Sequence, residues 1–114
     1  MNDRRKQLRA GAATADITPR KSVALYGYPH VPRFSTGTHD PLLATFLCLQ
    51  NRDHTVIVGA LDLLFLDPTT AKAIRRDIAD DAGVDPRDVF ISCTHTHSGP
   101  VTSRLLAWSD DATI

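Results

Sequence analysis

The sequence TVIVGAL, at residues 55–61, and the sequence VFISC, at residues 89–93, decide the fold. Both runs are short, apolar and rich in β-branched residues, a composition typical of buried strands. The stretch between them predicts a helix, since Asp67-Pro68 supplies a cap and a first-turn proline and Gly83 marks an end. The expected buried stripe of this helix consists of Ala71, Ile74, Ile78 and Ala82. A strand, a helix and a strand in this order predict a crossover that joins two parallel strands.

Two further strands are expected before this crossover. Residues 42–50 are apolar and lie one polar turn before residues 55–61, so the two runs predict an antiparallel hairpin. Residues 10–17 predict a first strand that ends in a turn organised by Asp16. Residues 20–41 form a long loop of the kind that builds functional sites. We therefore expect an α/β fold, a mixed β-sheet with a crossover helix, covered on both faces and incomplete without further chain or a partner subunit.

The composition is that of an ordinary globular chain, since 42% of the 114 residues are hydrophobic and 23% are charged. The 13 Lys and Arg side chains balance the 13 Asp and Glu, so no overall basic field attracts nucleic acid. Residues 1–9 are locally basic and are expected to form a flexible terminus before one domain portion at residues 10–114. No run approaches the ~18–20 apolar residues of a transmembrane segment, and no apolar signal segment follows the basic start. We therefore expect a cytoplasmic protein.

A histidine pair follows the strand at residues 89–93, in the sequence THTHSGP at residues 94–100. His95 and His97 are two positions apart, so at a strand end they would share one face, roughly 6.5–7 Å apart. Two imidazoles at that spacing are able to converge on one metal ion. The hydroxyls of Thr94, Thr96 and Ser98 are candidates for fixing the imidazole tautomers. The alternative is a histidine pair that only makes hydrogen bonds to its neighbours.

Three other side chains bear on the chemistry of this strand end. Asp62 follows residues 55–61 and would lie beside His95, where it either orients an imidazole or bonds the following loop. Cys48 and Cys93 lie in apolar runs and are expected to be buried free thiols. A Cys93–His95 nucleophile is disfavoured, because the strand spacing is too long for a hydrogen bond and apolar burial raises a thiol pKa. The metallo-β-lactamase and zinc-deaminase patterns fail, since neither the required acidic residue nor a later CxxC is present.

Residues 92–100 (SCTHTHSGP) resemble the THTHSGP signature of the neutral/alkaline (non-lysosomal) ceramidase family. Three further segments resemble family motifs in the same order: residues 11–19 (GAATADITP), residues 25–28 (LYGY) and residues 37–44 (GTHDPLLA). The resemblance spans residues 10–101 and is to the amino-terminal part of the family's catalytic domain.

The resemblance implies an amidase with one catalytic Zn²⁺. His95 would be a metal ligand, and His97 would act on the substrate or the transition state as the catalytic residue. His39 would line the site, whereas His30 and His54 are expected to be structural or exposed. The resemblance places the remaining ligands (His, Glu and Tyr) outside this chain. The chain is then either a fragment or the smaller chain of a processed or two-subunit enzyme, and we expect the second, with a companion polypeptide that carries these ligands.

The expected function is therefore hydrolysis of a C–N amide bond in a lipid or a smaller amide or lactam, as the small chain of a larger assembly. One alternative is a non-catalytic subunit or pseudo-enzyme that stabilises a partner chain. Another is a metal-binding or chaperone module, which would have to retain zinc in the isolated chain.

Overall fold

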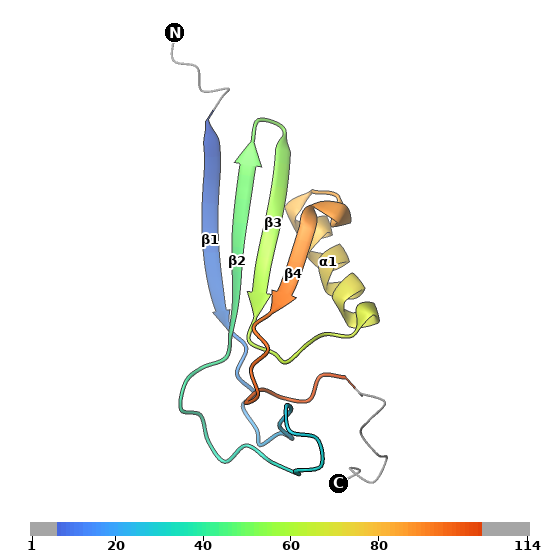
Figure 1. Cartoon of the computed structure of the whole chain (residues 1–114). Coiled ribbons are helices and arrows are strands. Elements are labelled where there is room, and N and C mark those ends of the chain that lie inside the picture. The colour runs from blue at the N-terminus through green and yellow to red at the C-terminus, as the bar shows by residue number, and fades with distance from the viewer. Residues whose placement is uncertain (1–6, 104–114) are drawn as a thin grey trace.

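The computed structural model describes residues 7–103, and this part of the chain forms a four-stranded sheet with the strand order β1-β2-β3-β4. The strands are β1 (Leu8–Asp16), β2 (Leu43–Asn51), β3 (His54–Leu61) and β4 (Val89–Cys93). Figure 1 shows the strands side by side, with the long loop between β1 and β2 and the chain after β4 gathered at one end of the sheet.

The pairing of the strands confirms the predicted mixed sheet. β1 and β2 are antiparallel, and β2 and β3 form the expected antiparallel hairpin. β3 and β4 are parallel, with Ile57 opposite Val89 and Leu61 opposite Cys93, as the crossover requires. β1 begins at Leu8, so the last residues of the predicted flexible terminus are paired in the sheet, where Leu8 faces Asn51.

Helix α1 (Pro68–Ala82) provides the crossover and has the predicted ends. Asp67 caps its first turn, because the carboxylate accepts from the backbone N–H of Thr70 at 2.9 Å. Gly83 adopts the left-handed conformation (φ 67°) that ends many helices. The buried stripe is shifted from the prediction, since Ala79 is fully buried whereas Ala82 is exposed.

The core lies between α1 and one face of the sheet. One cluster joins Ile57, Ala79 and Val89, and a second joins Ala44, Leu61 and Leu63. The Phe46 ring and Ile91 pack against both clusters and connect them. Phe46 has this place because its partner in β3 is Gly59, where a Cβ would lie 2.2 Å from the ring.

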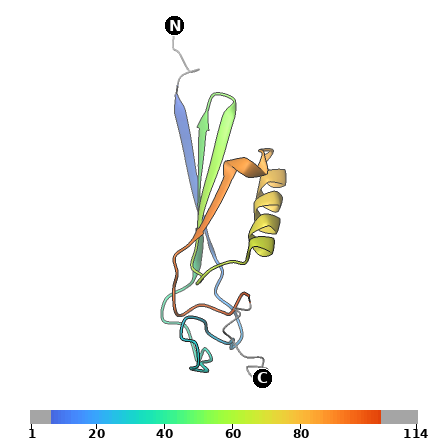
Figure 2. The ribbon, with the colours of Figure 1, turned by 45° about the vertical axis from the view of Figure 1, so that its right-hand side comes forward.

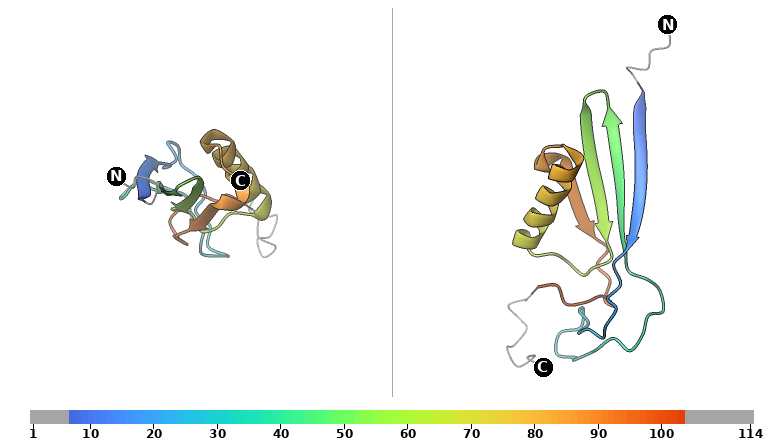
Figure 3. Two further views of the ribbon diagram at one scale, coloured as in Figure 1. Left: turned by 90° about the horizontal axis from the view of Figure 1, so that it is seen from above. Right: turned by 180° about the vertical axis from the view of Figure 1, so that it is seen from behind.

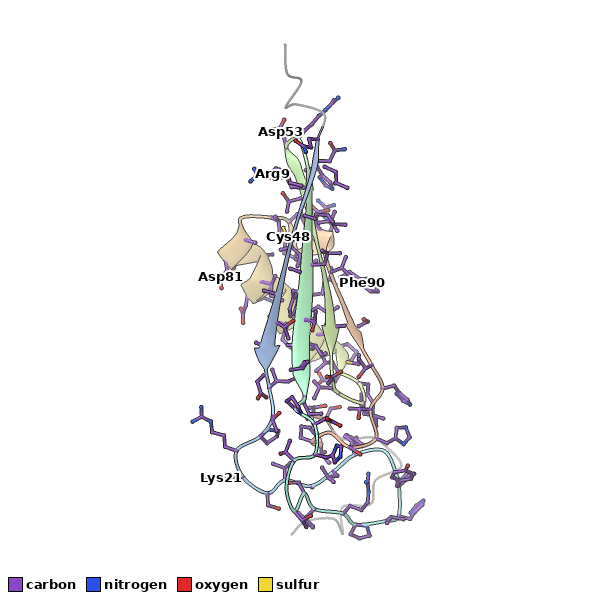
Figure 4. The ribbon with its side chains drawn as sticks, turned by 90° about the vertical axis from the view of Figure 1, so that its left-hand side faces the viewer. Arg9, Lys21, Cys48, Asp53, Asp81 and Phe90 are labelled. Atoms are coloured by element: carbon purple, nitrogen blue, oxygen red, sulfur yellow. The ribbon has the colours of Figure 1, made fainter. Side chains whose placement is uncertain are left out.

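The opposite face of the sheet is bare, so the prediction of two covered faces is wrong for the described residues. Leu47, Val58 and Phe90 point to this side and are 39%, 37% and 61% exposed. Figures 2 and 3 show α1 on one side of the sheet only, and Figure 4 shows Phe90 projecting away from the side that carries α1. We refer to the surface made by Leu47, Val58 and Phe90 as the bare sheet face.

β1 is an open edge of the sheet. All its residues are exposed, because α1 lies over β3 and β4 at the other edge. Cys48 of β2 is exposed for the same reason, which corrects the expectation of a buried thiol; Cys93 is half-buried. An exposed antiparallel edge of nine residues is a surface that natural proteins usually cover.

Within residues 7–103, no helix combines the length and the apolar character needed to cross a bilayer.

Candidate functional site

Residues 94–100, which we call the histidine segment, begin where β4 ends and do not continue its extended conformation. The N–H of Thr94 donates to the carbonyl of Leu61 at 2.9 Å, and the N–H of His95 donates to the carbonyl of Leu63 at 3.0 Å. His95 has a φ of 64°, in the left-handed region. This conformation costs a non-glycine residue energy and is found mostly at sites whose surroundings hold it in place. The histidines are therefore positioned by a turn and not by the strand alternation that the spacing suggested.

The ring of His95 is anchored through one nitrogen. Its Nδ1 lies 3.1 Å from the carbonyl oxygen of Leu64, and because a carbonyl only accepts, Nδ1 carries the hydrogen. The neutral ring then has its lone pair on Nε2. His95 is exposed, so Nε2 belongs to an accessible imidazole with a defined tautomer. This is the arrangement that protein metal sites use to orient a histidine ligand.

His97 brings a second imidazole to the first. The two ring centroids are 5.1 Å apart, and their planes meet at 72°. On its other side the His97 ring meets the Tyr28 ring edge-on, at 5.2 Å. The two imidazoles are therefore neighbours, but through the turn at His95 and not through the shared strand face that the sequence predicted.

Gly27 makes the close approach of His97 possible. A Cβ at Gly27 would lie 2.6 Å from Cγ and 2.7 Å from Cβ of His97. Gly27 also has a φ of 117°, which side chains rarely adopt. The long loop before β2 therefore packs directly against His97.

The predicted hydroxyl partners bond elsewhere. Thr94 donates from Oγ1 to Asp62 at 3.0 Å, and Oγ1 of Thr96 accepts from the N–H of Ser98 at 3.3 Å. The second carboxylate oxygen of Asp62 accepts from the N–H of Leu43 at 2.8 Å. Asp62 thus ties the ends of β2 and β4 together, and the role of fixing the His95 tautomer belongs to the Leu64 carbonyl.

An open cleft of about 1090 Å³ lies beside the histidine segment. Five of the residues singled out in the sequence line it, namely His39, Asp62, Thr94, Thr96 and Ser98. His39 is almost fully exposed, and its Nδ1 pairs with the carboxylate of Asp40 at 2.7 Å. Neither His95 nor His97 belongs to the described lining of this cleft, so the structure separates the histidine pair from the weaker candidates.

The other histidines and the cysteines lie apart from the pair. His30 is exposed, and His54 is an exposed residue at the start of β3, 3.5 Å from the carboxylate of Asp88. Burial raises the pKa of the Cys93 thiol above its usual value, which disfavours a thiolate at neutral pH. This agrees with the rejection of Cys93 as a nucleophile.

Sequence reasoning missed two groups that hold the site. The carbonyl of Leu64 is a backbone acceptor, and no residue type marks it in the sequence. Arg33 donates to the carbonyl of His97 at 2.6 Å, and it stands in a loop whose conformation the sequence does not define. Within residues 7–103 no group of three His, Cys, Asp or Glu side chains is placed to hold a metal ion, so the pair supplies two donors at most.

Solved structures similar to this chain include two ceramidases. A neutral ceramidase from Pseudomonas aeruginosa matches with a TM-score of 0.74 and 24% identity, over 84% of this chain and 16% of that chain. A ceramidase complexed with C2 matches with a TM-score of 0.69 and 23% identity, over the same shares of the two chains. No family model and no curated protein matches the sequence. The chain therefore resembles one portion of a ceramidase and shares its fold, over about one sixth of the length of those proteins.

Proposed function

We propose that this chain supplies His95 and His97 to the active site of a zinc-dependent hydrolase that cleaves a C–N amide bond. The observation that carries the proposal is the hydrogen bond from His95 Nδ1 to the Leu64 carbonyl, which in the neutral ring leaves the lone pair on Nε2, beside the His97 ring. The fold shared with ceramidases supports the choice of an amide as the bond that is cleaved.

His95 fits a zinc ligand by the chemistry of its ring. A neutral imidazole that donates its other N–H to a carbonyl is the form that binds metal ions in proteins. His95 Nε2 would hold the ion, which when bound supplies Lewis acidity and lowers the pKa of its water to about 7. The left-handed backbone and the Leu64 carbonyl keep this nitrogen in place before any ion arrives.

His97 is proposed as the residue that moves a proton or holds the carbonyl oxygen of the amide. Its ring lies against the rings of His95 and Tyr28, at centroid distances of 5.1 and 5.2 Å, and an imidazole in this place would offer a nitrogen to a substrate beside the proposed ligand. A positioned imidazole contributes typically 10²–10⁴-fold to such a reaction.

The remaining donors (His, Glu and Tyr) are proposed to come from a companion polypeptide. Two imidazoles bind a divalent ion weakly, and a catalytic zinc usually has three protein ligands. The bare sheet face and the open edge of β1 give such a companion apolar and main-chain surfaces on which to pack. The ceramidase structures have about six times the length of chain that this fold accounts for.

The experiment measures zinc content and amide hydrolysis in the full chain, together with any polypeptide that copurifies. Short-chain N-acyl sphingosine, a simple N-acyl amine and a lactam serve as substrates. His95→Ala should lose the zinc, with at least about a 10-fold weaker affinity, and all hydrolysis. His97→Ala should keep the zinc and lose about 10²-fold or more in kcat. His54→Ala is the matched control, because His54 is exposed and far from the pair in the fold.

Full zinc retention by His95→Ala would contradict the proposed ligand. An assembly that binds zinc through His95 but hydrolyses none of the amides would favour the non-catalytic alternative. Tight zinc binding by the chain without a companion would favour the metal-binding module.

A further inference from the structure

Arg33 bonds the backbone of the histidine segment. Its Nη2 donates to two backbone carbonyls, that of His97 at 2.6 Å and that of Tyr26 at 2.9 Å. These carbonyls belong to segments 71 positions apart in the sequence, the long loop before β2 and the turn after β4. One guanidinium therefore joins the two parts of the chain that make the site.

The same guanidinium also supports an aromatic ring. Cζ of Arg33 lies 4.5 Å from the centroid of the Tyr28 ring, within the range of a cation–π contact. The Tyr28 ring meets the His97 ring edge-on at 5.2 Å, and the His97 ring meets the His95 ring at 5.1 Å. The result is a continuous series of contacts, edge-on between the rings, that runs from the guanidinium to the proposed ligand.

We infer that Arg33 is a positioning residue that fixes the backbone of His97 and the ring of Tyr28, and thereby sets the orientation of the His97 imidazole. The catalytic meaning of this role rests on the proposed function, whereas the positioning itself does not. Arg33 would act through His97, because its described contacts are with the backbone of Tyr26 and His97 and with the Tyr28 ring.

An arginine suits this place better than a lysine. Its Nη2 donates to both carbonyls while Cζ lies 4.5 Å from the Tyr28 ring centroid, so the planar guanidinium spans contacts that the compact ammonium of a lysine would have to make from one nitrogen. Nε of Arg33 is buried and has no hydrogen-bond partner among the described residues, and the residue as a whole is half-buried, so this end of the side chain is shielded from water.

Arg33 bonds the backbone of His97, whereas His95 is held by other residues. His95 is anchored by its own bonds to Leu63 and Leu64, none of which involves Arg33. Tyr28 is half exposed, so little besides Arg33 and His97 holds its ring in the described part of the chain. Loss of Arg33 should therefore release His97 and leave His95 in place.

The test compares Arg33→Lys and Arg33→Met in the full chain with any companion that copurifies. Carbon–proton NMR spectra of the histidine rings report on each imidazole through the ring currents of its neighbours. The His97 ring signals should shift or broaden most in both variants. The His95 signals should shift less, because His95 keeps its own bonds and only the neighbouring His97 ring moves, and the His54 signals should stay unchanged. Arg20→Met is the matched control, because Arg20 is an exposed arginine in the same loop.

A kinetic arm addresses the catalytic role. In Arg33→Lys we expect kcat for amide hydrolysis to fall about 10- to 100-fold while KM and zinc content stay within about twofold. Added guanidinium ion should restore part of kcat in Arg33→Ala and none in His97→Ala. Tyr28→Leu, which keeps both carbonyl bonds, should give a smaller change of the same kind.

Unchanged His97 signals in both variants would overturn the inference, and so would equal shifts of His95 and His97. If the wild-type assembly binds no zinc and cleaves no amide, the proposed function fails, but the NMR comparison still decides whether Arg33 positions His97. Should Arg33→Met fail to fold, Arg33→Lys and Tyr28→Leu give the same discrimination.

Discussion

The sheet with its helix and the loop end of the molecule are held together in different ways. In the sheet region, main-chain ladders set the strand order, and apolar side chains such as Ile57, Ala79 and Val89 fill the space under α1. In the loop end, the positions of His95 and His97 depend on single polar contacts with backbone carbonyls. Loss of one contact in the packed region lowers stability but leaves the other contacts to hold the same arrangement, whereas loss of one polar contact at the loop end removes much of what positions an imidazole.

The two regions meet at the carboxyl ends of β3 and β4. Asp62 accepts from Leu43 and Thr94, so one carboxylate links the ends of β2 and β4 at the point where the histidine segment starts. This is the edge at which open α/β sheets place their sites. Substitutions at the loop end and at the junction should therefore disturb the histidines more than substitutions elsewhere.

Gly27→Ala should have the largest effect on folding stability, because it would disrupt the packing of the long loop against His97. The added Cβ would meet His97 at 2.6–2.8 Å, and alanine disfavours the φ of 117°. We expect a loss of about 2–4 kcal/mol in the free energy of unfolding, measured by chemical denaturation, and a displaced His97 ring. Gly37→Ala is the control, because nothing lies within 4 Å of its Cβ position, and it should change stability by less than about 0.5 kcal/mol. Equal stability of the two variants would show that the loop end is not packed on Gly27.

Asp62→Ala should have the next largest effect and tests the junction. It removes the acceptor for the Leu43 N–H and for the Thr94 hydroxyl, both part-buried or close to the sheet end. We expect a loss of about 1–3 kcal/mol in unfolding free energy and faster hydrogen exchange of the Leu43 amide. Asp62→Asn keeps one acceptor oxygen and should lose less. If the amide of Leu43 stays equally protected in Asp62→Ala, the junction depends on other contacts.

Asp85→Asn should have the smallest effect on folding stability. It tests a single polar contact outside the loop end, just before β4. The Arg87 guanidinium and the Arg87 N–H bond the Asp85 carboxylate and lower its pKa to about 2. Because the pKa in the folded chain is below the usual ~3.9, the carboxylate stabilises the fold above about pH 4. That contribution is lost as the pH falls from about 4 to about 2.

The difference in denaturation midpoint between wild type and Asp85→Asn should therefore be small but present at pH 7 and should close near pH 2. Asp81→Asn on α1 controls for the loss of one negative charge, and Figure 4 shows Asp81 on the helix side of the molecule. A difference that grows toward pH 2 would contradict the assignment to Asp85.

The prediction of the fold from the sequence succeeded where a local pattern was repeated over several residues. The apolar runs at residues 55–61 and 89–93 became β3 and β4 in parallel, and Asp67 and Gly83 mark the ends of α1. It failed where the answer depended on distant parts of the chain. Cys48 lies in an apolar run but is exposed, because α1 does not extend over β2 and β1.

The prediction of the site was partial for the same reason. The spacing of His95 and His97 indicated that both rings face one side, and the rings are 5.1 Å apart. The sequence did not predict that the candidate residues would lie in two groups. A cleft that His95 and His97 do not line contains His39, Asp62, Thr94 and Ser98. This separation arises because the chain turns at His95, with a positive φ that no spacing rule predicts.

The amino-acid sequence by itself determined the strands, the helix and its ends, because these depend on side-chain type and on neighbours within a few positions. The tertiary structure alone decided which face of the sheet is bare, which carbonyl fixes the His95 tautomer, and that Arg33 bonds a histidine 64 positions further along the chain. Such contacts join segments far apart in sequence, and backbone carbonyls are the same in every residue. Only the folded path of the chain determines which of them meet.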